Sequence, residues 1–171
     1  FVSLSHDDFG LILGGGNSRD QAQWSTFVAN GRLLPDHGEL IDDGIALTYG
    51  PIRCMLRVRL EAGCATIEAN SEHGDALQQF VLQVKAGDTV RTAGGHETTL
   101  GDDAVHWAGD QLGDWLEARG CRIELPHGAT FSYPTAPFNP YAADGAAAFG
   151  SQRGLLTVRV EQKPVRWMIR M

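Results

Sequence analysis

The residues best suited to bind a ligand lie in one polar segment near the amino end of the sequence. Three glycines, residues 14–16, interrupt a short apolar run, and the segment then continues with Asn17, Arg19, Gln21 and Trp24. Amide and guanidinium groups donate hydrogen bonds to sugar hydroxyls or to a uronate carboxylate, and an indole ring offers a stacking surface. The glycines equally suit a structural role, because glycine permits a bulge, a turn with positive φ or a close approach of two backbones. A sugar site and an ordinary connection between strands both remain open.

This glycine run does not match a nucleotide-binding motif. No Gly-Lys-Ser or Gly-Lys-Thr follows it, as a phosphate-binding loop requires, and the spacing of a dinucleotide fingerprint with its following helix is absent. The sequence also lacks the Gly-x-Ser-x-Gly motif that presents a nucleophilic serine. A Ser-His-Asp triad assembled in space is left open, because its members need not be close in sequence.

Two further aromatic residues and one polar pair extend the list of candidates. Trp107 and Tyr141 lie beside turn-rich sequence and are candidates for exposed sugar platforms. His106 and Asp110, which follow two further aspartates, could converge on a metal ion. None of the six histidines forms the i, i+4 pair of a zinc protease helix, and single histidines in turns are usually only solvated. We therefore expect no cofactor, with a structural metal as the alternative.

The clearest strand pattern lies at residues 52–60, where apolar residues alternate with Arg53, Arg57 and Arg59. Such alternation is typical of an antiparallel strand with one buried face. The three arginines share the opposite face and could meet an acidic polysaccharide. A face of this kind is more often solvated or ion-paired with a neighbouring strand, and the sequence favours that interpretation.

The elements that would position these residues are short strands. Alternating segments occur at residues 79–84, 121–125, 129–133, 155–160 and 165–170. Trp167 alternates with two apolar neighbours and is expected in the core, residues 33–38 are expected to form a turn, and residues 110–119 fit one helical turn or an irregular strand. Many short strands with frequent turns predict an all-β fold, and the uneven connections favour an antiparallel β-sandwich over a closed barrel.

The three cysteines give no sign of a metal ribbon or a disulfide framework. Cys54, Cys64 and Cys121 form no CxxC pair, and their number is odd. A tight turn at residues 61–63 would place Leu60 opposite Cys64, and Cys54 opposite about residue 70. A disulfide between Cys54 and Cys64 is therefore not expected, because its two Cα atoms must lie within about 7 Å of each other.

Length and composition indicate one globular domain spanning residues 1–171, with 43% hydrophobic and 20% charged residues. The formal net charge of -7, without any basic run, argues against a nucleic-acid partner. No apolar run approaches the roughly 18 residues of a membrane span, and no signal peptide is visible. The chain starts at Phe1 in what reads as mid-protein sequence, so we expect a processed chain or a domain of a longer protein.

Three short motifs resemble a known family. GLILGGGNS at residues 10–18, WSTF at residues 24–27 and PFNPY at residues 137–141 occur in an order similar to that in the carboxy-terminal β-sandwich of heparinase II/III-like polysaccharide lyases. The resemblance covers most of the chain, from about residue 9 to residue 171. In such lyases an α/α toroid holds most of the active site, and the sandwich packs against it and helps to line the substrate cleft. This sequence lacks the toroid and its Tyr and His motifs.

The resemblance implies a non-catalytic accessory module of a glycan-degrading enzyme. Its partners would be an acidic polysaccharide or a covalently linked helical catalytic domain, and the whole enzyme would be periplasmic or secreted. Some members of the family hold a structural metal in the sandwich, which is the family's support for a site at His106 and Asp110. Two alternatives stay open, a free-standing carbohydrate-binding or adhesion module and a small metal-dependent β-fold enzyme.

Overall fold

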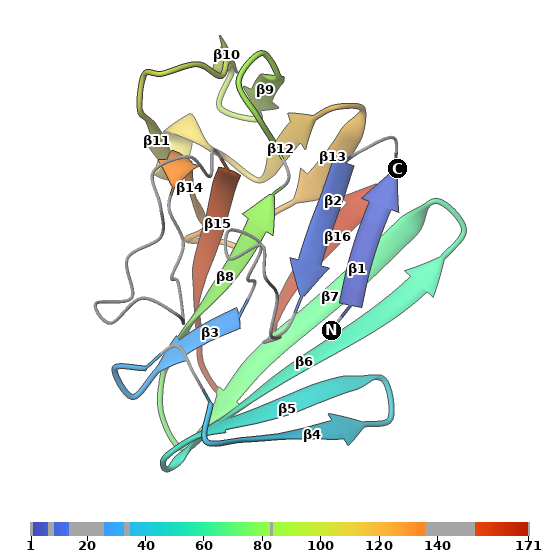
Figure 1. The fold of residues 1–171 in the computed structure, drawn as a ribbon, viewed down its shortest axis with the longest axis vertical. Coiled ribbons are helices and arrows are strands. Elements are labelled where there is room, and N and C mark those ends of the chain that lie inside the picture. The colour runs from blue at the N-terminus through green and yellow to red at the C-terminus, as the bar shows by residue number, and fades with distance from the viewer. Residues whose placement is uncertain are drawn as a thin grey trace.

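The predicted all-β antiparallel sandwich is confirmed. The computed structural model describes residues 2–6, 9–13, 26–32, 35–82, 84–135 and 153–170 (Figure 1). These residues form two antiparallel sheets, one of nine and one of seven strands, and a single 3-10 turn, η1 (Gly109–Gln111). The apolar faces of both sheets contribute to one continuous core. The fold therefore follows from the alternation in the sequence, which gives each strand one apolar face to bury.

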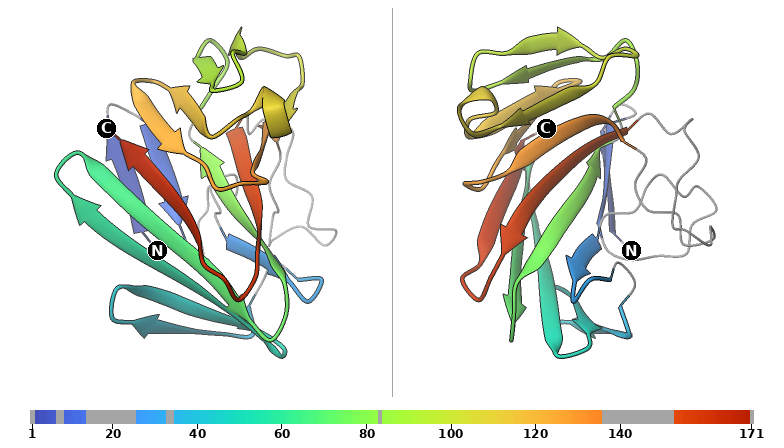
Figure 2. Two further views of the ribbon diagram at one scale, coloured as in Figure 1. Left: turned by 180° about the vertical axis from the view of Figure 1, so that it is seen from behind. Right: turned by 90° about the vertical axis from the view of Figure 1, so that its left-hand side faces the viewer.

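The larger sheet runs along the whole molecule, from β10 and β9 at the top of Figure 1 to β5 and β4 at the bottom. Figure 2, left, views the molecule from the side of this sheet. Its strands, in spatial order, are β10 (Glu97–Thr99), β9 (Thr89–Thr92), β12 (Trp115–Ala118), β13 (Cys121–Glu124), β16 (Val165–Arg170), β7 (Cys64–Glu72), β6 (Ile52–Glu61), β5 (Gly44–Tyr49) and β4 (His37–Ile41).

The smaller sheet packs on the inner side of the larger one, and its hairpin β1–β2 lies over β16 and β7 (Figures 1 and 2). Its strands are β1 (Val2–His6), β2 (Phe9–Leu13), β8 (Ala76–Leu82), β15 (Arg153–Val160), β14 (Thr130–Thr135) and β11 (Val105–Ala108). A seventh strand, β3 (Thr26–Ala29), pairs with the first half of β8, while β2 pairs with its second half. One edge of β8 is thus shared by two strands.

Trp167 joins the two sheets in the middle of the core, as its alternation predicts. It is 1% exposed, and its ring meets that of Phe80 edge to face, with centroids 4.7 Å apart. The indole Nε1 donates a hydrogen bond of 2.8 Å to Oε1 of Gln78, which is buried on β8. Among the described residues the Nε2 of Gln78 has no hydrogen-bond partner. This buried hydrogen bond joins β16 of the larger sheet to β8 of the smaller one, and a second, from Ser71 Oγ on β7 to Val160 O on β15, also links the two sheets.

The faces of β6 are those expected from its alternation, but its register with β7 is shifted by one residue. Cys54 and Leu56 point into the core, and the arginines point out. The hairpin pairs Glu61 with Cys64, so Cys54 lies opposite Ser71 rather than opposite residue 70. The turn holds two residues instead of three, which accounts for the shift. None of the three cysteines forms a disulfide, and for Cys54 and Cys64 this agrees with their separation along the ladder.

The burial of the cysteines predicts which thiol will react. Burial raises the pKa of the Cys54 thiol to about 12, because a low-dielectric surrounding disfavours the thiolate. Cys121 is also buried, whereas Cys64 is partly exposed at the start of β7. We expect a disulfide reagent at about pH 8 to modify Cys64 alone in the folded protein and all three cysteines in denaturant. Peptide mapping checks the site, and rapid labelling of Cys54 without denaturant would contradict the described packing.

The structure corrects the prediction for residues 33–38 and decides between the two alternatives for residues 110–119. Residues 33–38 do not all form a turn, since β4 already begins at His37. The side chains of β4 are mostly exposed, so this edge strand lacks the apolar alternation that reveals a strand. In residues 110–119 both alternatives occur in succession, because η1 is followed by β12. Among the described residues no helix is long and apolar enough to cross a bilayer.

Candidate functional site

Arginine side chains cover the outer face of the larger sheet, which we call the arginine face. They lie on β6, β9, β13 and β16, at positions that alternate with core residues. The seven members are Arg53, Arg57, Arg59, Arg91, Arg122, Arg166 and Arg170. Each pairs with a carboxylate that lies on the same sheet or in the turn after β4. The partners are Glu39, Asp43, Glu68, Glu72, Glu97, Glu117 and Glu124.

The ion-paired interpretation of the three arginines of β6 is confirmed. Arg53 pairs with Glu39 on the edge strand, and Arg57 and Arg59 both reach Asp43, at 3.2 and 3.6 Å. Pairing makes this face electrically balanced, whereas the whole chain carries a formal charge of -7. The arginine face therefore carries no net charge that would repel an anionic ligand.

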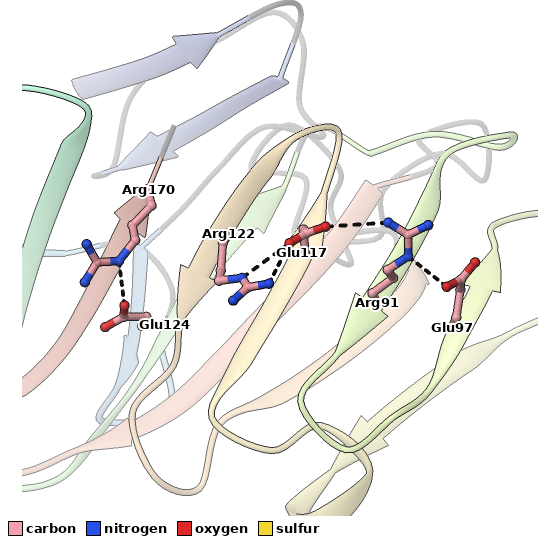
Figure 3. A network of polar contacts seen from close by, with 6 residues as sticks. All are labelled: Arg91, Glu97, Glu117, Arg122, Glu124 and Arg170. Carbon is pink, nitrogen blue, oxygen red and sulfur yellow. Dashed lines mark hydrogen bonds and ion pairs between the residues drawn. The ribbon is translucent and has the colours of Figure 1, made fainter.

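Figure 3 shows how register builds one continuous row of charges across four strands. Glu97, Arg91, Glu117 and Arg122 are successive Cα partners from β10 to β13. Arg91 donates to Glu97 over 2.7 Å, and Arg122 donates to Glu117 over 3.0 Å. Arg91 Nη1 lies 3.6 Å from Glu117, close enough for an ion pair but too far for a hydrogen bond. Arg91 is thus shared between two carboxylates, with the shorter contact to Glu97.

The ring of Trp115 packs against Arg122, one member of this row. The guanidinium carbon of Arg122 lies 4.2 Å from the centre of the Trp115 ring. At this distance the ring quadrupole attracts the cation. The contact orients Arg122 but covers part of the ring that a sugar would otherwise stack on. Trp115 is therefore a support for an arginine rather than an open platform.

A small polar cavity of about 280 Å³ opens beside the row, and we call it the Arg91 cavity. The side chains that line it are those of Asp88, Thr89, Arg91, Glu117 and Arg119. Arg119 and Asp88 are both largely buried and approach to 3.8 Å. The cavity therefore presents two guanidinium groups, two carboxylates and one hydroxyl within a small volume.

The backbone at Arg119 is unusual and places its side chain in the cavity. Arg119 and Gly120 form the two-residue loop between β12 and β13, and both have positive φ, 51° and 80°. Such a type I′ loop favours Asn-Gly or Gly-Gly. A left-handed conformation costs a residue other than glycine about 1–2 kcal/mol. Arg119 is a poor choice for the turn itself, so its value lies in its side chain.

A second cavity, of about 410 Å³, lies between η1 and the turn after β13. It is lined by Asp110, Asp114 and His127 together with the apolar surface of Leu125 and Pro126. Leu125 N donates to Asp114 O over 2.8 Å and ties the two walls together. This cavity is acidic, in contrast to the Arg91 cavity. Carboxylate and imidazole groups on an apolar wall suit a neutral, hydroxyl-rich ligand.

Known proteins give no guide to either site. Comparison with protein families, curated proteins and solved structures finds no match. The function must therefore be inferred from the geometry of the described residues.

Most of the predicted glycan site cannot be placed. Asn17, Arg19, Gln21, Trp24 and Tyr141 lie outside the described residues. They stay predictions, and neither cavity can be joined to them.

The prediction that Trp107 is an exposed platform is wrong. Trp107 is 8% exposed and packs between His96 and Phe131, with ring centroids 6.0 and 5.7 Å apart. It lies on β11, where pairing with Phe131 of β14 directs both rings into the core. Neighbouring turns in the sequence did not reveal this pairing, because it joins residues far apart in the chain.

The predicted metal pair does not find further ligands in the described part of the chain. His106 is exposed, and its Nδ1 lies 2.8 Å from Oγ of Ser132. Asp110 lines the larger cavity instead. Among the described residues no three His, Cys, Asp or Glu side chains converge on a common point. Asp114 and His127, which share the cavity with Asp110, were not predicted, because they come from two separate turns.

The ion pairs of the arginine face predict a pH dependence of stability. A hydrogen bond from Arg166 lowers the pKa of Glu68, so the folded state favours the carboxylate more than the unfolded state does. A lowered carboxyl pKa contributes stability above its unfolded value of about 4.3, and that stability is lost as the pH falls through the folded pKa. Arg166→Gln should therefore reduce the fall in Tm between about pH 6 and about pH 3.

Lys163→Gln serves as the control for this measurement, because Lys163 is exposed and makes no ion pair with a described residue. Thermal melts of the wild type and both variants at the two pH values suffice. An Arg166→Gln variant whose Tm falls as steeply as that of the wild type would mean that the pair does not favour the folded state.

Proposed function

We propose that the chain is the β-sandwich accessory module of a heparinase II/III-like polysaccharide lyase, and that it holds an acidic glycan against its arginine face. The carrying observation is the set of seven arginines on one face of an otherwise acidic chain. Guanidinium groups match carboxylates and sulfates in a fork-like, two-bond geometry. Arginine is therefore the side chain best suited to a uronate polymer.

An acidic glycan could bind the arginine face by replacing protein carboxylates as the partners of the arginines. The ion pairs of the arginine face are mostly exposed, with side chains such as those of Arg91 and Glu97 more than half accessible. Exposed pairs contribute about 0–1 kcal/mol each, so a glycan carboxylate can replace a protein carboxylate at small cost. Several such exchanges along one polymer add up, because the sugars are linked to each other.

Packing against a helical catalytic domain is the second part of the proposal. Two large apolar side chains, Leu40 and Leu60, are 88% and 65% exposed. Leu60 lies on the same inner face of β6 as buried Leu56, and Leu40 lies in register with half-buried Ile45. The exposed apolar side chains at this edge of the larger sheet would suit contact with the apolar face of a helix.

The chemistry would reside in that other domain. His106 lies within hydrogen-bond distance of Ser132 and makes no ion pair with a carboxylate of the described residues, so these two side chains do not form a serine triad there. We accordingly expect the isolated chain to bind acidic glycan without cleaving it. Formation of unsaturated uronate ends by the isolated chain would instead make it an enzyme.

Binding to an acidic polymer is the direct test. Hyaluronate and heparin should retard the chain in affinity electrophoresis at low salt, whereas neutral dextran should not, and added salt should weaken the binding. The variant Arg122→Gln with Arg170→Gln should bind several-fold more weakly. Arg159→Gln is the control, because Arg159 lies on β15 of the smaller sheet and pairs with Asp75. No retardation by any acidic polymer would sink the proposal.

The larger cavity favours one other candidate, a free-standing carbohydrate-binding module for neutral sugars. Asp110, Asp114 and His127 can bind ring hydroxyls there, while the negative charge of the two aspartates would oppose a uronate. Asp114→Asn should weaken binding of a neutral oligosaccharide in calorimetry if this candidate is correct. A glycan array with only acidic ligands bound would rule it out.

A further inference from the structure

β4 is an open edge of the larger sheet. It forms the lower margin of this sheet in Figure 1, and among the described strands it pairs with β5 alone. The ladder between the two strands runs from His37 to Ile41 without a shift in register. An unpaired edge presents backbone N–H and C=O groups that can pair with another chain. β4 therefore offers a template for one more strand.

β4 lacks the features by which proteins usually protect such an edge. Its sequence, His-Gly-Glu-Leu-Ile, contains no lysine and no proline, and Leu40 is 88% exposed. Its one carboxylate, that of Glu39, is held by Arg53 of β6. The opposite edge strand of the sheet, β10, is only three residues long. Very short edge strands discourage pairing, whereas an exposed apolar edge favours it, so β4 is the edge suited to a partner.

The free backbone groups of β4 are those of Gly38 and Leu40. Val58 N of β6 donates to the carbonyl of the residue before Gly44 over 2.8 Å, so the groups of Gly44 itself point to Ile41 of β4. Backbone groups of successive residues point to opposite sides of a strand, so those of Ile41 and of every second residue before it face β5. The N–H and C=O groups of Leu40 and Gly38 therefore face the open edge.

Two copies of the chain can pair through this edge about a two-fold axis. An antiparallel pair of identical strands is self-complementary, because each contact occurs twice. An axis through Leu40 sets Leu40 directly opposite Leu40 of the second copy, Glu39 opposite Ile41, and His37 opposite Asp43, which follows β4. An axis through Glu39 would instead set two carboxylates directly opposite each other, which is destabilising.

We propose that the chain forms a two-fold dimer in which β4 pairs antiparallel with β4 of a second copy, centred on Leu40. The pairing brings the two Leu40 side chains together on the inner side of the sheet and satisfies the free backbone groups of Leu40 and Gly38. Charge is complementary on the outer side, where the imidazole of His37 approaches the carboxylate of Asp43. Glu39 stays in its own ion pair, and within β4 no two like charges lie directly opposite each other.

The dimer goes beyond the proposed function, because it joins the larger sheets of two copies into one. The two-fold axis is perpendicular to the sheet, so the two arginine faces lie side by side on the same side of the dimer. A helix of the proposed catalytic domain would contact the inner face of the sheet, whereas the second copy occupies its edge.

Sedimentation equilibrium of the 171-residue chain at about 0.1 mM tests the proposal, with twice the mass of one chain as the expected result. Leu40→Lys should raise the dissociation constant of the dimer about tenfold or more, because it sets two like charges opposite each other at the axis. The variant should still fold, since Leu40 is 88% exposed. Leu60→Lys is the matched control, because Leu60 is also exposed but lies on β6, which β5 and β4 separate from the open edge.

Cysteine cross-linking tests the register. In a Cys64→Ser background, Leu40→Cys should form a disulfide between two chains on mild oxidation, because directly opposite Cα atoms lie about 5.5 Å apart. His37→Cys is the control. The two copies of position 37 would lie roughly 20 Å apart along the paired strands, so they should not form a disulfide.

The outcomes separate this inference from the proposed function. A chain that stays monomeric at this concentration overturns the dimer, and so does a dimer that Leu40→Lys leaves unchanged. A disulfide through position 37 instead of position 40 also overturns it, as do assemblies that keep growing with concentration, since they would join β4 to a different edge. A dimer of a chain that no acidic polymer retards supports this inference and overturns the proposed function.

Discussion

Replacing Gly44 with alanine is expected to lower the free energy of unfolding by about 3 kcal/mol or more. A Cβ atom at Gly44 would lie 1.8 Å from the carbonyl oxygen of Leu56 and 2.9 Å from the Cα atom of Arg57. Both atoms belong to the backbone of β6, which pairs with Gly44 in register. A flexible side chain could move aside, but a paired strand cannot do so without breaking its ladder.

Gly101→Ala is the matched control for Gly44→Ala. A Cβ atom at Gly101 meets nothing within 4 Å, and the backbone there has an ordinary φ. Alanine at such a place stabilises a protein by about 0.4–1 kcal/mol, because it restricts the unfolded chain. Urea denaturation of both variants measures the difference. Equal midpoints for the two variants would show that β5 and β6 do not pair as described.

Disruption of the hydrogen bond between Trp167 and Gln78 is expected to give the second large effect. Trp167→Phe removes the indole N–H and part of the ring volume, and it takes from the buried Gln78 amide the side-chain partner that it has among the described residues. The cost should be about 2–4 kcal/mol. Gln78→Leu should cost less, because it also removes the buried Nε2 that has no hydrogen-bond partner among the described residues.

A double-mutant cycle separates the bond from the packing. The variant carrying both Trp167→Phe and Gln78→Leu should be less destabilised than the sum of the single changes, by about 0.5–3 kcal/mol. Gln79→Leu is the control, because Gln79 follows Gln78 on β8 but alternates to the other face of the sheet. Strictly additive effects of the two core changes would mean that the hydrogen bond between Trp167 and Gln78 contributes nothing to stability.

Sequence alternation predicted the strands that bury one face and missed those that do not. β6 and β16 were recognised because their apolar and polar residues alternate over most of their length. β4 was not predicted, because it is an edge strand with few core contacts. The shift of one residue between β6 and β7 arose at the turn, where one residue more or less moves every pair along the ladder.

The candidate site was much less predictable than the fold. The Arg91 cavity joins residues of β9, β12 and two turns, and only the pairing of β9 with β12 brings them together. One local signal was available, an arginine where the hairpin loop favours Asn or Gly at position 119. Trp107 shows the opposite error, since nearness to turns in the sequence did not decide which face of β11 it occupies.

The positions of β15 and β16 have a consequence for synthesis in the cell. β15 lies between β8 and β14 in one sheet, and β16 lies between β7 and β13 in the other (Figure 1). Each sheet lacks an internal strand while the ribosome still holds β15 and β16. Every other strand has emerged by then, but the strands on either side of the missing one have no partner along one edge. Incomplete sheets expose strand edges that can pair with other nascent chains. Newly made protein should therefore depend on chaperones until residue 170 is free.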